Sequence, residues 1–112
     1  MDVQEIRVET DQFKWLPQAI ELWGIALAFV QGERALGFAD ALDSMHQANW
    51  RLLALSDIWE KKGTPIPQPV QDAIAAYKEL EQIWDGRKAA SLLDVTILII
   101  KTTYKLRELL DE

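Results

Sequence analysis

Residues 69–85, which read PVQDAIAAYKELEQIWD, decide the fold class of this chain of 112 residues. At about 100° per residue, the apolar side chains of this stretch fall on one side of a helix and the polar side chains on the other. Proline suits the first turn of a helix, because its missing N–H would be unpaired there, and Gly86 provides a stop. The stretch therefore predicts an amphipathic helix over about residues 69–85. Its apolar side consists of Val70, Ala73, Ile74, Tyr77, Leu80 and Trp84.

The rest of the chain divides into segments with the same helical period. Gly32, the proline-rich stretch 61–69 and Gly86 supply the turn residues between these segments. Short connections favour antiparallel neighbours, so we expect one all-α domain over residues 1–112, folded as an antiparallel up-down four-helix bundle. The helices are expected at about residues 17–31, 34–60, 69–85 and 88–110.

Two segments fit the helical pattern less well. Ile6 and Val8 alternate with charged residues, which favours a short extended N-terminal arm over residues 1–12. Residues 95–100, VTILII, are rich in β-branched side chains and by composition could form a strand. We expect a helix there, because the helical period continues on both sides of the run.

The charge of the chain argues against two classes of partner. Eighteen acidic residues stand against twelve basic ones, a net charge of −6, and residues 1–60 alone carry ten acidic and four basic residues. Nucleic acid and anionic lipid both attract clustered Lys and Arg, so we expect neither as a partner. A basic protein surface would prefer the N-terminal half of the chain.

No stretch is apolar enough to suggest a membrane span or a secretory signal. The longest stretch without a charge, Leu22–Gly32, has eleven residues. A spanning helix needs roughly 18 or more apolar residues. The first residues also lack the basic start and apolar run of a signal peptide. We therefore expect a cytoplasmic protein that does not enter membranes.

Most catalytic arrangements lack their parts in this sequence. There is no cysteine, which excludes disulfides, thiolate zinc sites and a cysteine nucleophile, and there is a single histidine, His46. The sequence has neither a glycine-rich phosphate loop nor the paired Glu-x-x-His motifs of di-iron bundles. We expect no enzymatic activity, no metal site and no cofactor.

The best remaining candidate for chemistry is the set Asp40, Asp43 and His46 in the second helix. Spacings of three residues place neighbours about 60° apart on the helix, within reach of one another. Such a set could hold a metal ion or act as a general base. We favour a solvated face instead, because a site would need further ligands from another chain or from the arm.

Two polar residues fall on the apolar stripe of the same helix. Asn49 and Ser56 lie seven residues apart there, and an unmade hydrogen bond inside a protein costs about 1–3 kcal/mol. We expect Ser56 to bond locally to the backbone and Asn49 to fix the helix register. The alternative is a polar group that orients a small ligand in the core.

The five tryptophans divide unequally on the helical wheels. Trp50 projects on the polar face of the second helix, whereas the other four fall on stripes that face the bundle. A tryptophan exposed among acids is a candidate interface anchor, because tryptophan is enriched at binding hot spots. The alternative is that the N-terminal arm covers Trp50. The predicted partner-binding residues are Trp50, Asp43, His46, Ala54, Asp57 and Ile58, and the predicted core tryptophans are Trp15, Trp23, Trp59 and Trp84.

The last helix carries more apolar surface than one neighbour-facing stripe requires. Beside the stripe that contains Leu92 and Val95, it has a second one, formed by Leu93, Ile97, Ile100 and Tyr104. Either this helix sits centrally in the bundle, or the second stripe meets another copy of the chain. We favour the second explanation, and the arm could add a strand across the dimer. The sequence thus predicts a homodimer.

These observations leave three classes of function. We favour a non-enzymatic protein-interaction module, such as an adaptor, an assembly factor or a regulator, which binds a protein partner through the acidic helix face around Trp50. The first alternative is an acidic inhibitor, immunity protein or antitoxin that covers a basic site. The second is a small-ligand carrier or enzyme with an apolar, tryptophan-lined pocket.

Overall fold

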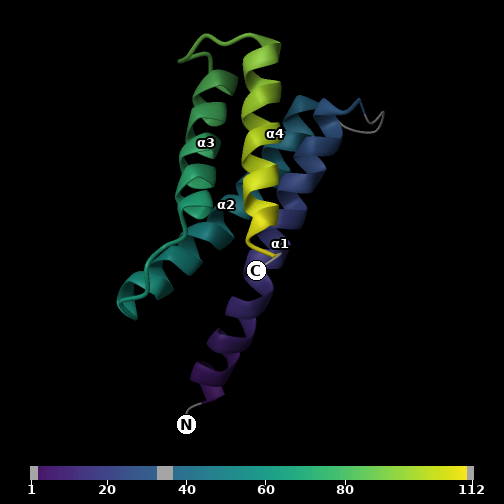
Figure 1. The fold of residues 1–112 in the computed structure, drawn as a ribbon. Coiled ribbons are helices and arrows are strands. Elements are labelled where there is room, and N and C mark those ends of the chain that lie inside the picture. The colour runs from purple at the N-terminus through teal and green to yellow at the C-terminus, as the bar shows by residue number, and fades with distance from the viewer. Residues whose placement is uncertain (1–2, 33–36, 111–112) are drawn as a thin grey trace.

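The structure is a computed structural model that describes residues 3–32 and 37–110, with side chains from residue 14 onward. Four helices and no strand are found in this described part of the chain (Figure 1). This confirms the predicted all-α class. The helices are α1 (Val3–Val30), α2 (Phe38–Lys61), α3 (Gln68–Trp84) and α4 (Leu92–Glu108).

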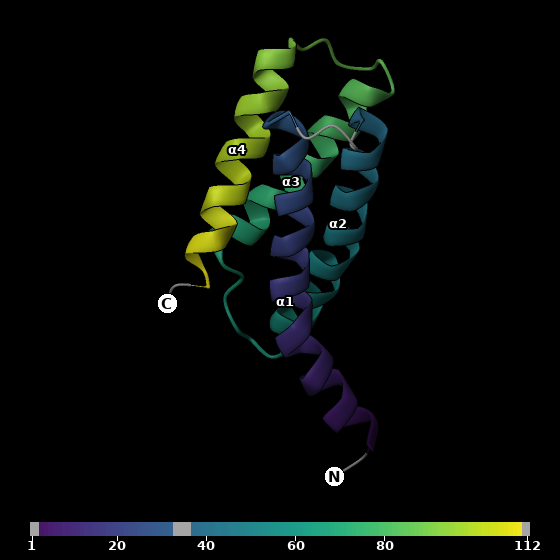
Figure 2. The same cartoon turned by 90° about the vertical axis from the view of Figure 1, so that its right-hand side faces the viewer.

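The four helices enclose one core. Helices that follow one another in the chain are neighbours, and α1 also packs against α4, whereas α2 and α4 do not touch among the described residues. Helices α2 and α4 therefore lie diagonally across the core. Figures 1 and 2 show α2 inclined to its neighbours. A regular antiparallel up-down bundle, the finer part of the expected fold, stays a prediction.

The N-terminal segment differs from the sequence prediction. Helix α1 begins at Val3 and runs through Pro17, so residues 3–12 are helical and do not form an extended arm. Proline normally ends or kinks a helix, which is why the sequence suggested a start at residue 17. The alternation around Ile6 and Val8 was too short to specify a strand. Figure 2 shows the first turns of α1 extending beyond the other three helices.

The start of α4 is fixed by a capping box. The Asp94 N–H donates to Ser91 Oγ and the Ser91 N–H donates to Asp94 Oδ2, both at 3.1 Å. The helix therefore begins at Leu92, four residues later than expected, because these two bonds satisfy N–H groups that have no partner at a helix start. Residues 95–100 lie inside α4. The expected start of the second helix at residue 34 lies outside the described residues.

Side chains from all four helices build the core. Two hydroxyl groups in the core donate hydrogen bonds to backbone carbonyls. Ser44 Oγ of α2 donates to the Leu22 carbonyl of α1 at 2.7 Å, and Thr103 Oγ1 of α4 donates to the Ile99 carbonyl at 2.7 Å. The hydroxyls of Ser44 and Thr103 are thus paired with backbone carbonyls. The largest fully buried apolar side chains are Trp23, Met45, Leu52, Leu55, Leu80, Ile99 and Leu106.

The capping box generates a stability prediction. Ser91→Ala removes the acceptor of the Asp94 N–H, and the free energy of unfolding should fall by about 1 kcal/mol. Urea unfolding followed by circular dichroism measures this change. Ser91→Asn keeps an acceptor at the same position and should stay close to wild type. An equal loss in both variants would contradict the role of Ser91 as the cap.

Candidate functional site

Trp50 is exposed yet held in place. Its side chain is 46% exposed, and its ring meets the edge of Trp15 from α1 with the ring centroids 6.0 Å apart. On its face lies the Arg51 guanidinium, 4.4 Å from the ring centroid, a cation–π contact. Arg51 is fixed in turn, because its Nε donates to Gln18 Oε1 at 3.1 Å and its Nη1 donates to the Gln47 carbonyl at 2.9 Å. The indole is therefore oriented from two sides.

Most of the predicted partner-binding residues surround Trp50 as expected from the helical period. Ala54 and Ile58 are half-buried, and the charged and imidazole side chains are exposed. Leu53, which is 48% exposed, was missed, although its position three residues after Trp50 makes it a neighbour on the helix surface. It adds an aliphatic side chain beside the indole. We call the exposed set the Trp50 face: Asp43, His46, Trp50, Leu53 and Asp57.

The Trp50 face is less acidic than the sequence suggested. Asp57 pairs with Lys61 at 3.0 Å, and Asp43 Oδ2 accepts a hydrogen bond from Gln47 Nε2 at 3.0 Å. Arg51 adds a positive charge against the ring itself. Five of the ten acidic residues in the first sixty have side chains outside the described part: Asp2, Glu5, Glu9, Asp11 and Glu33. The alternative of an arm covering Trp50 also concerns side chains outside that part.

His46 is tied to α3. The Tyr77 hydroxyl donates to Glu81 Oε2 at 2.9 Å, and His46 Nδ1 lies 2.8 Å from the same hydroxyl oxygen. Because the hydroxyl has a single proton and donates it to Glu81, the contact with His46 requires the hydroxyl oxygen to accept from Nδ1. Burial, together with the hydrogen bond and charge of Glu81, raises the pKa of Tyr77 to about 12.

The set Asp40, Asp43 and His46 is divided among other tasks. Asp40 Oδ2 accepts the Gly37 N–H at 3.1 Å at the start of α2, and His46 bonds to Tyr77. Among the described residues there is no group of three His, Asp or Glu side chains arranged to hold a metal ion. The structure thus gives this set roles in capping and in joining α2 to α3.

The raised pKa of Tyr77 predicts a pH dependence. Between pH 10 and about 12, the hydroxyl ionises in the unfolded chain but stays protonated in the folded one, so the free energy of unfolding should fall as the pH rises through this window. Phenolate absorbance should show a step near pH 12 that Tyr77→Phe removes. If the step removed by this substitution lies near pH 10, the hydrogen bond to Glu81 does not hold the proton.

The tryptophans follow the sequence prediction with one exception. Trp23 is fully buried and Trp15 and Trp59 are half-buried, but Trp84 is 52% exposed. The expectation that Trp84 faces the core is wrong, because Trp84 is the last residue of α3 and no following turn covers it. Its ring rests against Phe38 at 5.2 Å between centroids. It lines a shallow groove of about 350 Å³ with Ala39, Leu42, Asp43, His46 and Tyr77.

The two polar residues on the α2 stripe behave differently. Ser56 Oγ donates to the Leu52 carbonyl at 2.8 Å, which confirms the expected local bond. Asn49 Oδ1 and Trp23 Nε1 are buried with no hydrogen-bond partner among the described residues. Neither residue lines any of four grooves found in the described part of the chain. A ligand-orienting role for Asn49 therefore gains no support.

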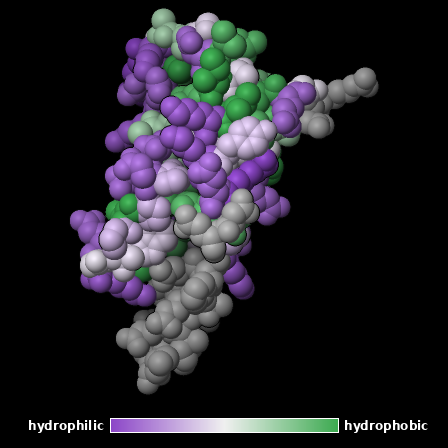
Figure 3. All heavy atoms as spheres, in the orientation of Figure 1, coloured by the Kyte–Doolittle hydropathy of each residue, from purple (hydrophilic) through white to green (hydrophobic). Residues whose placement is uncertain are grey.

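Helix α4 presents an apolar surface on its outer side. Leu93 is 66%, Ile97 53% and Tyr104 51% exposed, while Ile100 is half-buried. Among the described residues α4 packs against α1 and α3 but not against α2, so this helix does not occupy a central position in the bundle. Figure 3 shows hydrophobic atoms gathered over the upper part of α4. We call Leu93, Ile97, Ile100 and Tyr104 the outer stripe.

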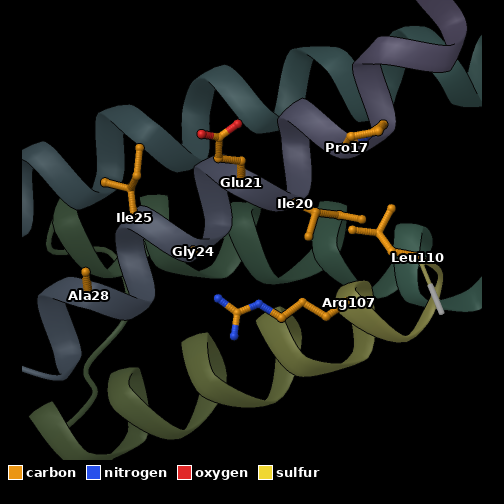
Figure 4. Close-up of a pocket in the computed structure, with 8 residues that line it drawn as sticks. All are labelled: Pro17, Ile20, Glu21, Gly24, Ile25, Ala28, Arg107 and Leu110. Atoms are coloured by element: carbon orange, nitrogen blue, oxygen red, sulfur yellow. The ribbon is translucent and has the colours of Figure 1, made fainter.

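A groove of about 580 Å³ between α1 and α4 was not anticipated from the sequence. Figure 4 shows Arg107 of α4 reaching across it toward Gly24 of α1, whereas the Glu21 carboxylate points away from the guanidinium. A Cβ added at Gly24 would lie 3.3 Å from Arg107 Nη2. Arg107 makes no ion pair among the described residues, and its guanidinium lies 5.8 Å from the centroid of the Tyr104 ring. The groove is therefore lined mainly by apolar residues, with Arg107 lying across it.

The position of Gly24 generates a second stability prediction. Glycine inside a helix costs about 0.5–1 kcal/mol relative to alanine, and the Arg107 guanidinium is the flexible end of a side chain that can move aside. Gly24→Ala should therefore raise the free energy of unfolding by up to about 1 kcal/mol in a urea titration. A clear loss of stability would show that Arg107 is fixed over Gly24.

Comparison of the chain with protein-family models, with curated proteins and with solved structures finds no match. No helix in the described part is both long and apolar enough to cross a membrane. Any inference about function must therefore start from the chemistry of the Trp50 face, the outer stripe and the grooves.

Proposed function

We propose that this chain is a non-enzymatic protein-interaction module, an adaptor, assembly factor or regulator, which binds a protein partner through the Trp50 face. One observation carries the proposal: the half-exposed indole of Trp50 is already oriented by Trp15 and Arg51. A side chain fixed before binding loses little conformational entropy when a partner covers it. Preorganised aromatic anchors of this kind are typical of binding hot spots.

The exposed part of the indole is large enough to matter for affinity. A tryptophan buries 150–250 Å² when fully covered, so its exposed half offers on the order of 100 Å². At about 25 cal/mol per Å² this area contributes about 2.5 kcal/mol, or roughly 60-fold in affinity. Leu53 beside it, 48% exposed, extends the apolar centre.

The charges around this centre indicate the partner's chemistry. Asp43 and Asp57 flank the indole along α2, and both are exposed. A partner that offers an apolar socket with a basic rim would complement this arrangement, and the rim charges would act mainly on the rate of association. The net charge of −6 supports the same expectation that nucleic acid and anionic membranes are not partners.

The finer features expected from the sequence belong to this proposal. They are an antiparallel up-down arrangement of the helices, a homodimer and a place in the cytoplasm. The diagonal position of α2 and α4 supports the first, because successive helices of such a bundle are neighbours. The exposed outer stripe of α4 supports the second.

The alternatives have weaker support. An acidic inhibitor depends on charge, yet Asp57 is paired with Lys61 and Arg51 covers the central ring. A tryptophan-lined carrier pocket would need its tryptophans to meet around a cavity. Trp23 is fully buried in the core and Trp84 is exposed at the end of α3, so these two rings do not line one pocket.

The Trp50 face can be tested with a matched pair of tryptophan variants. Trp50→Ala should reduce capture of the partner by immobilised protein at least 10-fold, because it removes the anchor. Trp84→Ala removes a ring of similar exposure, 52%, which shares a groove with Asp43 and His46 but not with Trp50, and should leave most of the capture intact. Quantitative mass spectrometry of the captured proteins measures both effects.

The same experiment at low and high salt separates the candidate functions. Capture through an apolar anchor persists at high salt, whereas capture by an acidic inhibitor is lost because salt screens exposed charges. Equal losses in the Trp50 and Trp84 variants, with both proteins folded by circular dichroism, would contradict the proposal.

A further inference from the structure

The outer stripe of α4 faces away from the core of its own chain. On a helical wheel its mean direction lies about 150° from that of the buried residues of the same helix. Its residues are half-buried to well exposed, and the described chain has no element that covers them. The buried residues of α4 are Val95, Ile99, Thr102, Thr103 and Leu106.

The spacing of the stripe reads the same in both directions. Its residues follow one another at intervals of four, three and four, so an antiparallel copy presents the same ladder to the first. Leu93 then meets the partner's Tyr104, and Ile97 meets the partner's Ile100, in alternating layers of the kind found in coiled coils. We propose that two copies of this chain associate through the outer stripes of α4, packed antiparallel about a twofold axis.

The charges beside the stripe select the antiparallel orientation. Asp94 and Lys101 lie on the same flank, and both are exposed. In the antiparallel pair Asp94 is offset from the partner's Lys101 by about 3 Å along the axis, and the twofold axis repeats the contact. In a parallel pair Asp94 and Lys101 would instead lie next to the opposite flank of the partner helix, where the uncharged Thr96 is located.

Both charged groups are available for this contact. One carboxylate oxygen of Asp94 accepts the Ser91 N–H, and its other oxygen remains an acceptor. Lys101 makes no ion pair with any described residue. The reciprocal contact between Asp94 and Lys101 therefore favours a second copy of this chain as the partner that covers the outer stripe.

The dimer leaves the Trp50 face open. Helix α2 lies diagonally across the core from α4, so two copies joined at α4 carry their α2 helices on outer sides. That both sites then bind a partner at once rests on the proposed function, whereas the dimer itself does not. Two linked sites raise the avidity for a partner that presents more than one binding surface.

Molar mass in solution is the first test. At about 50 μM, wild type should sediment as a dimer in analytical ultracentrifugation, and Ile97→Glu should sediment as a monomer, since a charge would be buried in the stripe. Leu53→Glu places the same charge at an equally exposed leucine of α2 and should remain dimeric. A monomeric wild type overturns the proposal. A dimer that persists in the Ile97 variant does so as well.

The flanking charges test the orientation. Lys101→Glu brings like charges together twice in the antiparallel pair and should raise the dimer Kd about 3- to 10-fold. Lys105→Glu makes the same change of charge one turn along α4 but farther from the seam, and should change the Kd less than twofold. Equal effects of the two substitutions would overturn the assigned register.

Cysteine cross-linking gives an independent answer, because the chain has no cysteine of its own. A mixture of the Leu93→Cys and Tyr104→Cys variants should form a disulfide-linked heterodimer under mild oxidation. Leu93→Cys alone should not, because its two sulfurs would lie about 16 Å apart along the axis. Cross-linking of Leu93→Cys with itself would show a parallel pair and overturn the proposal.

Loss of the dimer and loss of partner capture remain distinguishable. Ile97→Glu tests only the outer stripe, and a monomer that still captures the partner through Trp50 leaves the proposed function intact. Leu53→Glu changes the Trp50 face without touching α4, so a dimer that fails to capture the partner leaves the dimer intact.

Discussion

The packing of α1 against α2 orients Trp50, the residue on which the proposed function rests. Trp23 of α1 is fully buried in the common core, and Ser44 of α2 donates to a carbonyl of α1 at 2.7 Å. The same pair of helices brings Trp15 against Trp50 and Gln18 against Arg51. If α1 shifted by one turn along α2, the core would lose its largest side chain and the indole would lose both of its supports.

How far the sequence predicts this fold depends on how local each signal is. The apolar stripe of α3 repeats over four turns, and such a pattern survives in any tertiary context. Pro17 suggested a helix start that the structure does not have, because the surrounding packing can override the preference of one residue. Ser91 was not recognised as the cap of α4, because a cap is defined by the hydrogen bonds that it makes. Trp84 lies on the apolar stripe of α3, but it is the last residue of the helix and the neighbouring helices do not cover it. The sequence of α3 does not show how far the neighbouring helices extend, because this depends on tertiary packing.

The candidate site shows the same division. The helical wheel alone places Trp50 on the polar side of α2, and Leu53 follows from its spacing of three residues. The supports of Trp50 could not be found this way, since Gln18 and Arg51 are 33 residues apart and Trp15 belongs to another helix. What turns an exposed tryptophan into an anchor is its fixed orientation, and that property arises only when α1 and α2 pack.

Helix α4 places polar and apolar residues in an order that the core of one chain does not explain. Thr102 and Thr103 are almost completely buried, while Leu93 and Ile97 are more than half exposed. Burying a leucine in place of a threonine would stabilise the core by roughly 1–3 kcal/mol, and an exposed leucine contributes almost nothing in water. The free-energy cost of burying the Thr103 hydroxyl is small because the hydroxyl donates to the Ile99 carbonyl. The apolar side chains are therefore placed where no other part of the described chain covers them, as the proposed contact with a second α4 would require.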